Sequence, residues 1–291
     1  MAEKNVALAI AQKTQESVLS KVKKFQENGE LHFPANYRPE NALKAAWLQI
    51  QQTVDRNKKP AIEVCTQVSI ANAMLSTVVQ GLNPDKKQCY YIVYGDQLVA
   101  QRSYFGSECV AKSVNPNVQQ FNAQVIYDGD EVAFEIRNGK KYVTSHKQKF
   151  QDINKANIIG AYCTVVQKDG DNYSVIMTMD EIKEAWKKSK NNPIDEKGDL
   201  KPNSTHGQYT AEMACKTVIG RAAKHIINTS DDSNIVVEFA KQNDLDNAKA
   251  EAEDEIAENA NNGDYIDVDC VEVDKTTGEL TEHAESMAEE A

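Results

Sequence analysis

The stretch 211–228 offers the clearest candidate for a binding surface in this chain of 291 residues. If it forms a helix, with about 100° between successive residues, one half of its surface gathers cationic and small side chains: Lys216, Thr217, Gly220, Arg221, Lys224 and His225. The other half is apolar and suited to packing, with Cys215, Val218, Ile219, Ala222, Ala223 and Ile226. Positive charge beside small residues lets a phosphate backbone approach closely. The pattern favours binding of a polyanion; an ordinary solvated helix face is the alternative.

Two other segments combine cations with aromatic rings. The first surrounds a helix expected over 103–114 and supplies Gln101, Arg102, Tyr104 and Lys112. The helical projection turns Phe105 inward and Tyr104 outward. The second is a strand expected over 141–146, whose extension adds Lys147 and Lys149 without an intervening acidic residue. Because phosphates take the charge of such side chains while exposed bases stack on the rings, both segments are typical of proteins that bind single strands.

Motifs for catalysis and for metal binding are missing. The sequence contains no P-loop, no glycine-rich dinucleotide fingerprint, no nucleophile elbow and no H-E-x-x-H motif. The five histidines lie far apart, and the six cysteines form no C-x-x-C pair. Asp264, Asp267 and Asp269 lack the glycine of a calcium loop. We therefore predict no catalytic residue, no metal site and no cofactor. A nuclease that uses scattered carboxylates is the enzymatic alternative.

The charge of the chain is divided unevenly. The net charge is −11, but residues 241–291 hold 17 acidic residues and three lysines, a charge of −14, which leaves +3 on residues 1–240. The body of the protein is therefore compatible with a nucleic-acid partner. The composition predicts that 241–291 is an acidic, largely disordered tail. A tail of this charge can compete with DNA for a basic groove.

The periodicity predicts an α+β fold that begins with helices, over 14–28, 39–57 and 64–80. From Tyr90 to Thr178, alternating segments flank the turn signals at 95–96, 128–129, 138–139 and 168–171. They predict antiparallel hairpins in a meander, interrupted by the helix over 103–114. A capping box at 178–181 opens a further helix. Residues 189–207 are predicted to form a long mobile loop, before the basic amphipathic helix and the disordered acidic tail.

The chain carries Val79-Gln80-Gly81-Leu82-Asn83-Pro84, then 101–106, 127–135, 177–182 and 211–221 in a characteristic order and spacing. These motifs, which cover about residues 40–230, resemble those of the RecT family of phage and prophage recombinases, the single-strand annealing proteins. The resemblance implies DNA contacts by Arg102, Tyr104, Lys112, Lys216, Thr217, Arg221 and Lys224. Gln101 lies in the same motif, whereas Lys147 and Lys149 come from the charge pattern alone. The segment 85–89 lacks a glycine that the family pattern would place there.

The resemblance also implies an activity. A protein of this kind binds single-stranded DNA without ATP, anneals complementary strands in homologous recombination, holds the annealed duplex intermediate, and assembles into homo-oligomeric rings or filaments. A phage 5′–3′ exonuclease and the host single-strand-binding protein are the implied partners. A passive coat on single strands, without pairing activity, is the alternative.

The expected organisation has three segments. Residues 1–38 form an N-terminal helical segment suited to oligomer contacts, 39–240 form the DNA-binding annealing core, and 241–291 form the tail. No apolar run approaches the roughly 18–20 residues that a bilayer span requires, so no membrane partner is expected. The scattered cysteines suggest a reducing compartment, and the expected location is the cytoplasm of a bacterial host cell.

Overall fold

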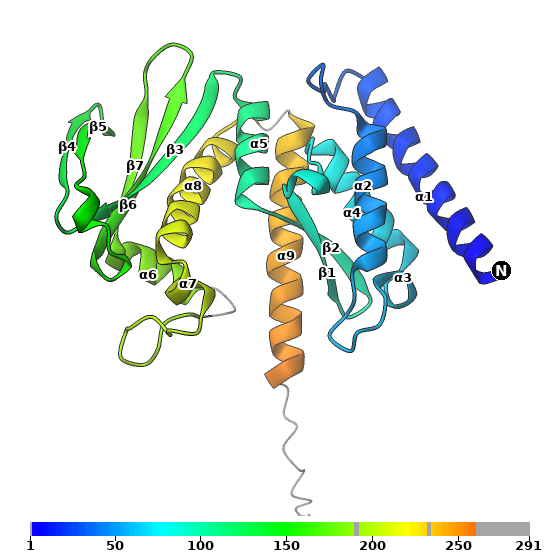
Figure 1. The fold of residues 1–291 in the computed structure, drawn as a ribbon. Coiled ribbons are helices and arrows are strands. Elements are labelled where there is room, and N and C mark those ends of the chain that lie inside the picture. Colours follow the sequence, from blue (N-terminus) through cyan, green and yellow to red (C-terminus); the bar gives the residue numbers. More distant parts are fainter. Residues whose placement is uncertain (1, 189–191, 232–233, 260–291) are drawn as a thin grey trace, which may run out of the picture. The chain divides into compact units, whose positions relative to one another are not determined.

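The computed structural model describes residues 2–188, 192–231 and 234–259 (Figure 1). Its helices are α1 (Ala2–Glu27), α2 (Pro39–Gln52), α3 (Ala61–Val64), α4 (Gln67–Val79), α5 (Tyr104–Val114), α6 (Met179–Lys187), α7 (Thr205–Gln208), α8 (Thr210–Asn228) and α9 (Ile235–Asn259). Its strands are β1 (Cys89–Tyr94), β2 (Gln97–Arg102), β3 (Val118–Tyr127), β4 (Glu131–Arg137), β5 (Lys140–Lys147), β6 (Ile158–Gln167) and β7 (Tyr173–Thr178). The predicted α+β class, with helices first and one helix inserted among antiparallel strands, is confirmed.

The described residues up to Asp254 form one compact unit, and all candidate surfaces belong to it. None of the helices within the described ranges combines the length and the apolar character that a membrane span needs.

The first helices build a core with the β1–β2 hairpin. Leu43 of α2 and Met74 of α4 are fully buried where these helices pack, and α1 adds Val18 and Val22 to the same core. Strand β2 packs against α4, and Gly95 turns the chain between β1 and β2 with a φ of +57°. Residues from α1 to β2 therefore share one interior.

Two predicted helices are shorter in the structure. The helix expected over 39–57 ends at Gln52, because Val54 pairs with Pro60 in an isolated β-bridge that turns the chain. The helix expected over 64–80 becomes the short α3 and the longer α4, which starts after the Thr66 cap. The side chain of Thr66 accepts a hydrogen bond from the Ser69 N–H at 3.2 Å, a cap that stabilises a helix start.

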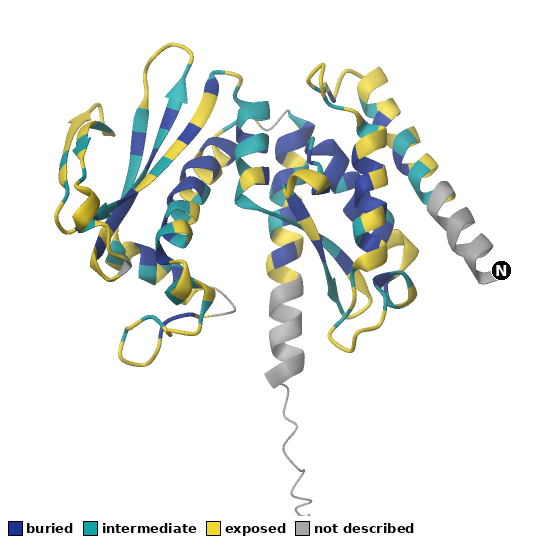
Figure 2. Ribbon diagram, in the orientation of Figure 1, coloured by how far each residue is buried: buried dark blue, intermediate teal, exposed yellow. Residues whose placement is uncertain are grey.

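The second layer is an antiparallel sheet in the order β3-β6-β7-β5-β4. Its order corrects the predicted meander, because the turn at 128–129 does not join neighbouring strands: β3 pairs with β6. The physical reason is burial. Strand β3 packs against α5 and α8 at one edge of the sheet and buries Phe121 and Val125, whereas β4, at the opposite edge, is exposed along almost its whole length (Figure 2).

Two other turns form hairpins as predicted. Asn138 and Gly139 both have positive φ angles, +49° and +79°, as a two-residue turn between β4 and β5 requires. Strands β6 and β7 pair in antiparallel register. The capping box at Thr178 and Glu181 is also present, and it opens α6 directly after β7.

The described part of the long segment 189–207 is held in place, unlike the mobile loop that its composition predicts. Ile194 pairs with Leu200 in a β-bridge and is only 3% exposed. The side chain of Ser204 caps α7 by accepting from the Gly207 N–H at 3.0 Å. One buried isoleucine in a polar segment thus suffices to anchor it.

The start of the acidic tail is helical, whereas its composition predicts disorder. Helix α9 runs from Ile235 to Asn259 and so includes the first part of the segment 241–291. It is held because Val236 and Ala240 are buried, and because the amides of Asn243 and Asn247 both donate to the Ala100 oxygen of β2, at 2.7 and 3.0 Å. Residues 260–291, with the carboxylates at 264, 267 and 269, lie outside the described residues.

Two glycines give opposite predictions for stability. A methyl group at Gly106 in α5 would overlap the backbone oxygen of Gln88 and lie 2.7 Å from Cγ of Arg102, whereas one at Gly220 in α8 would meet nothing within 4 Å. Gly106→Ala should lower the free energy of unfolding by about 1–3 kcal/mol, and Gly220→Ala should raise it by about 0.5–1 kcal/mol. Urea unfolding followed by circular dichroism measures both, and equal effects would contradict this packing.

Candidate nucleic-acid interface

One half of the surface of helix α8 packs against the rest of the fold, and the other half carries charged side chains. The helix lies against β3, β6 and β7 on one side and contacts α5 on another (Figure 1). Ala214, Val218, Ala222 and Ile226 are buried, which confirms the predicted apolar half. A long helix with one buried stripe leaves its remaining side chains in solvent, so the opposite half is open.

The exposed side of α8 carries three cations, Lys216, Arg221 and Lys224, which we call the α8 cations. None of them forms an ion pair with any other described residue. Gly220 lies among them with open space above its Cα. The α8 cations are therefore unneutralised and accessible, as contacts to a phosphate backbone require.

Thr217, predicted to contact DNA, forms two hydrogen bonds within the fold. The Trp186 Nε1–H donates to its hydroxyl oxygen at 2.8 Å, and the hydroxyl donates to the Met213 oxygen at 2.8 Å. The indole of Trp186 is buried and meets the ring of His206 edge-on at 4.6 Å. Burial and the nearby charge of Lys216 both lower the pKa of His206. Thr217 thus fastens α6 to α8.

The side chain of Arg102, for which the family resemblance implies a DNA contact, is buried and only 7% exposed. Nη1 donates to Oε1 of Gln80 at 2.7 Å and to the Ala240 oxygen at 3.4 Å, while Nη2 donates to Oδ1 of Asp244 at 2.7 Å. Nε donates to the Ser107 hydroxyl at 3.3 Å. The sequence gives no sign of this network, because Asp244 is 142 residues away.

A hollow of about 290 Å³ joins two of the predicted segments. It lies between β2, α5, α8 and α9, and its lining includes Gln101, Arg102, Ser107, Gly220, Lys224 and Asp244. The fold therefore brings the predicted residues Gln101 and Arg102 next to Lys224 of α8. Asp244 places a carboxylate in the same hollow, so a segment of the acidic region already occupies part of the basic surface.

Tyr104 and Phe105 form a ring pair at the start of α5. Their centroids are 4.0 Å apart with an interplanar angle of 33°, and Phe105 is 45% exposed. The inward position predicted for Phe105 is wrong, because Gly106 and Val110 take the buried face of α5. Burial, with smaller contributions from Glu108 and from Cys215 of α8, raises the pKa of Tyr104.

Phe105 is a candidate contact that the sequence does not predict. Its exposed ring suits the stacking of unpaired bases, whereas Tyr104 is half-buried against the core and lies close enough to Cys215 of α8 to be influenced by it. The available signal was the adjacent pair of aromatic residues directly after a helix cap, at Ser103.

The remaining predicted lysines lie on other elements. Lys112 on α5 is 3.7 Å from Glu108 and 5.8 Å from the centroid of the Phe121 ring. Lys147 ends β5 and pairs with Glu131 of the edge strand β4 at 3.4 Å. Lys149 is exposed just beyond β5. Helix α8 contacts the sheet at β3, β6 and β7. Because Lys147 and Lys149 lie at the end of β5, they belong to a different part of the sheet.

One buried chain of polar groups has the residue types of a catalytic relay. His146 donates or accepts through Nε2 at 3.0 Å from Oδ2 of Asp130 and through Nδ1 at 3.1 Å from the Tyr162 hydroxyl. Burial raises the pKa of Asp130, but hydrogen bonds from the Tyr127 N–H, Gln148 and His146 outweigh it, and the pKa lies below its ordinary value.

These hydrogen bonds from Asp130 through His146 do not activate the Tyr162 hydroxyl. Burial and the charge of Asp130 raise the pKa of Tyr162, whereas a nucleophile needs a lowered pKa or an adjacent free base. The arrangement instead fastens β5 to β6, and His146 is a hydrogen-bonded structural histidine. In the described part of the chain, no three His, Cys, Asp or Glu side chains gather as metal ligands would.

Cations along one helix that form no ion pair with the described residues, and an exposed phenylalanine ring on the helix packed beside it, are features of a protein that binds nucleic acid. The family model that matches the chain is that of the RecT family, and it covers residues 40–261. Because this match spans most of the sequence, the chain belongs to the RecT family, whose proteins act in DNA recombination and single-strand annealing. A search of curated proteins finds no match to the chain.

The two arginines of the predicted interface should behave differently when they are removed. Arg102→Ala leaves Gln80 and the carboxylate of Asp244 without their partner, and we expect the free energy of unfolding to fall by about 2–4 kcal/mol. Arg221→Ala removes an exposed side chain and should change it by less than about 0.5 kcal/mol. Urea denaturation gives both values, and similar losses for the two variants would show that Arg102 is not a structural residue.

Proposed function

We propose that this protein binds single-stranded DNA and anneals complementary strands without ATP, as an oligomer. The observation that carries the proposal is the set of α8 cations, exposed and unneutralised, in a chain of the RecT family. Phosphates of one strand bind these cations and leave the base edges free. A second strand then tests complementarity by pairing, so the protein contributes no sequence preference.

The small charge of the body supports assembly into an oligomer. Residues 1–240 carry only +3, and the α8 cations offer three contacts per protomer. Because affinity for a strand grows with the number of phosphates that are neutralised, a strand is held firmly when several protomers align their α8 helices. A ring or a filament supplies such a repeated surface.

The ring pair Tyr104–Phe105 supports the choice of single strands over duplex. Bases within a duplex are stacked on each other, whereas unpaired bases are free to stack on an exposed phenylalanine such as Phe105. We place Gln101 and Lys224 at the hollow between β2, α5, α8 and α9, and Lys112, Lys147 and Lys149 at later contacts along the strand.

The proposal extends to partners and location. A 5′–3′ exonuclease of the same phage supplies the single strands, and the host single-strand-binding protein is displaced from them. The cytoplasm of the bacterial host is where these partners meet the protein. Co-purification of the exonuclease with the full chain tests the first contact.

An annealing assay tests the proposed function. Two complementary labelled oligonucleotides are mixed with the full chain without ATP, and duplex formation and strand length are followed across a salt series. We expect faster pairing of intact strands, with an acceleration that fades as salt increases. The triple variant Lys216→Ala/Arg221→Ala/Lys224→Ala should lower affinity for every sequence alike and reduce the slope of log K against log salt by about 2.

A matched control removes three exposed cations elsewhere, Lys44, Lys59 and Lys197. This control should keep at least half of the annealing rate, because the same charge is lost away from α8. Tight binding by the natural chain without pairing would instead identify a passive coat, shortened strands would identify a nuclease, and a defect limited to certain sequences would contradict recognition through the backbone.

A further inference from the structure

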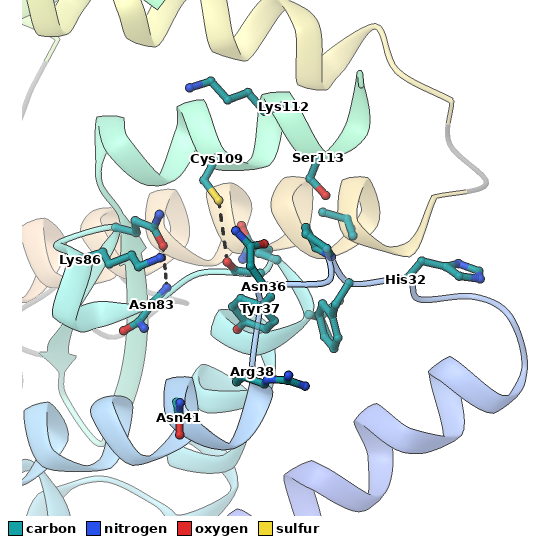
Figure 3. Close-up of a pocket in the computed structure, with 17 residues that line it drawn as sticks. His32, Asn36, Tyr37, Arg38, Asn41, Asn83, Lys86, Cys109, Lys112 and Ser113 are labelled. Carbon is teal, nitrogen blue, oxygen red and sulfur yellow. Dashed lines mark hydrogen bonds between the residues drawn. The ribbon is translucent and has the colours of Figure 1, made fainter. Parts of the chain in front are cut away.

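A second cavity, of about 430 Å³, is lined by residues of α5 that do not line the first hollow (Figure 3). Its walls come from the segment 32–41 before and within α2, from the turn 79–88 after α4, and from Cys109, Lys112 and Ser113 of α5. The turn contains the motif Val79 to Pro84. Cavities of this size are typical of sites for small ligands.

The lining of this cavity is positive. Arg38, Lys86 and Lys112 contribute to it, together with His32, and no aspartate or glutamate does. Arg38 and Lys86 form no ion pair with the described residues, and Lys112 has only the 3.7 Å contact with Glu108. Since neighbouring cations repel one another unless an anion lies between them, this lining is suited to an anionic ligand.

The cavity also offers flat apolar walls. The rings of Phe33 and Tyr37 are 4.8 Å apart at an angle of 41°. The hydroxyl of Tyr37 donates to the Leu82 oxygen at 3.0 Å, which fixes this ring against the turn after α4. Burial raises the pKa of Tyr37 well above its ordinary value, so the phenol stays neutral. A fixed neutral ring is a suitable surface for a heterocyclic base.

Free amide groups complete the lining. Asn36 and Asn41, both labelled in Figure 3, line the cavity, and neither side chain forms a hydrogen bond with any described residue. Amides donate and accept at once, as the edge of a base requires. Cations at the rim, rings in the wall and free amides together match one chemical class, a nucleoside phosphate.

Gln80 connects the two hollows. It lines this cavity, while its Oε1 accepts from Nη1 of Arg102, which lines the hollow beside α8. Helix α5 likewise contributes Ser107 to one hollow and Cys109 to the other. The two hollows are therefore neighbours in the fold, linked by the Gln80–Arg102 hydrogen bond and by α5.

We propose that this cavity holds one nucleotide of the bound single strand, with its base against Phe33 and Tyr37 and its flanking phosphates on Arg38 and Lys86. This inference rests on the proposed function and deepens it. One captured nucleotide in each protomer fixes the register of the strand on an oligomer, and the remaining bases stay available for pairing.

Salt-dependent binding and photo-cross-linking test the proposal together, with the full chain and a dT oligonucleotide that contains 4-thiothymidine. We expect cross-links to peptides that contain Phe33 or Tyr37. Arg38→Ala/Lys86→Ala should abolish these cross-links, reduce the salt slope by about 1.4 and weaken binding about tenfold or more at 0.1 M salt. The control Lys59→Ala/Lys197→Ala, which removes two exposed cations elsewhere, should leave the cross-links at Phe33 and Tyr37 in place and change affinity less than threefold.

The outcomes separate this inference from the proposed function. Annealing by the natural chain with cross-links only to α8 and α5 peptides would overturn the cavity site and leave annealing intact. Cross-links at Tyr37 without any pairing would support the cavity and overturn annealing. Free dTMP or ATP that binds in the cavity, while the oligonucleotide gives no cross-link there, would show a nucleotide-binding site and overturn its assignment to the DNA strand.

Discussion

A single guanidinium, that of Arg102, joins four elements of this fold. It extends from β2 to Gln80 at the end of α4, to Ser107 of α5, and to Ala240 and Asp244 of α9. A buried cation is stable only when its donors are satisfied, so these elements must meet in one arrangement. Arg102 lines the hollow beside α8, and Gln80, which accepts its hydrogen bond, lines the second cavity. Both hollows therefore adjoin this buried network.

Around this centre the fold divides its cations into two kinds. Arg102 is neutralised by Asp244, and Lys140 and Lys147 are paired with Asp171 and Glu131. The exposed ion pairs of Lys140 and Lys147 contribute little to stability, but they reduce the positive charge that a polyanion meets. The α8 cations and Arg38 and Lys86 form no ion pair with any described residue. Both hollows that adjoin α5 therefore carry unneutralised positive charge, although the whole chain is acidic.

The position of α9 gives the acidic region a structural role. Its first turns are part of the core, because Val236 and Ala240 are buried and two asparagine amides satisfy the Ala100 oxygen on β2. Asparagine side chains there occupy an acceptor that an additional strand would otherwise use. Asp244 then brings negative charge to the hollow that Lys224 also lines. A phosphate that enters this hollow meets the positive charge of Lys224 and the negative charge of Asp244 together. Because the two charges offset each other, binding there is favoured only where the strand also reaches the other α8 cations.

The sequence by itself determined the features that a few neighbouring residues control: the buried and charged halves of α8, the Asn138-Gly139 hairpin, the capping box at Thr178, and the α+β class. Side-chain periodicity, turn conformation and helix caps act over one or two turns of chain, so their signals are local. Only the tertiary structure decided that β3 pairs with β6, that Phe105 is exposed, that Thr217 holds Trp186, and that Asp244 neutralises Arg102. Those outcomes depend on which surfaces from distant parts of the chain pack against each other and exclude water. The spacing of residues along the chain does not reveal these long-range contacts.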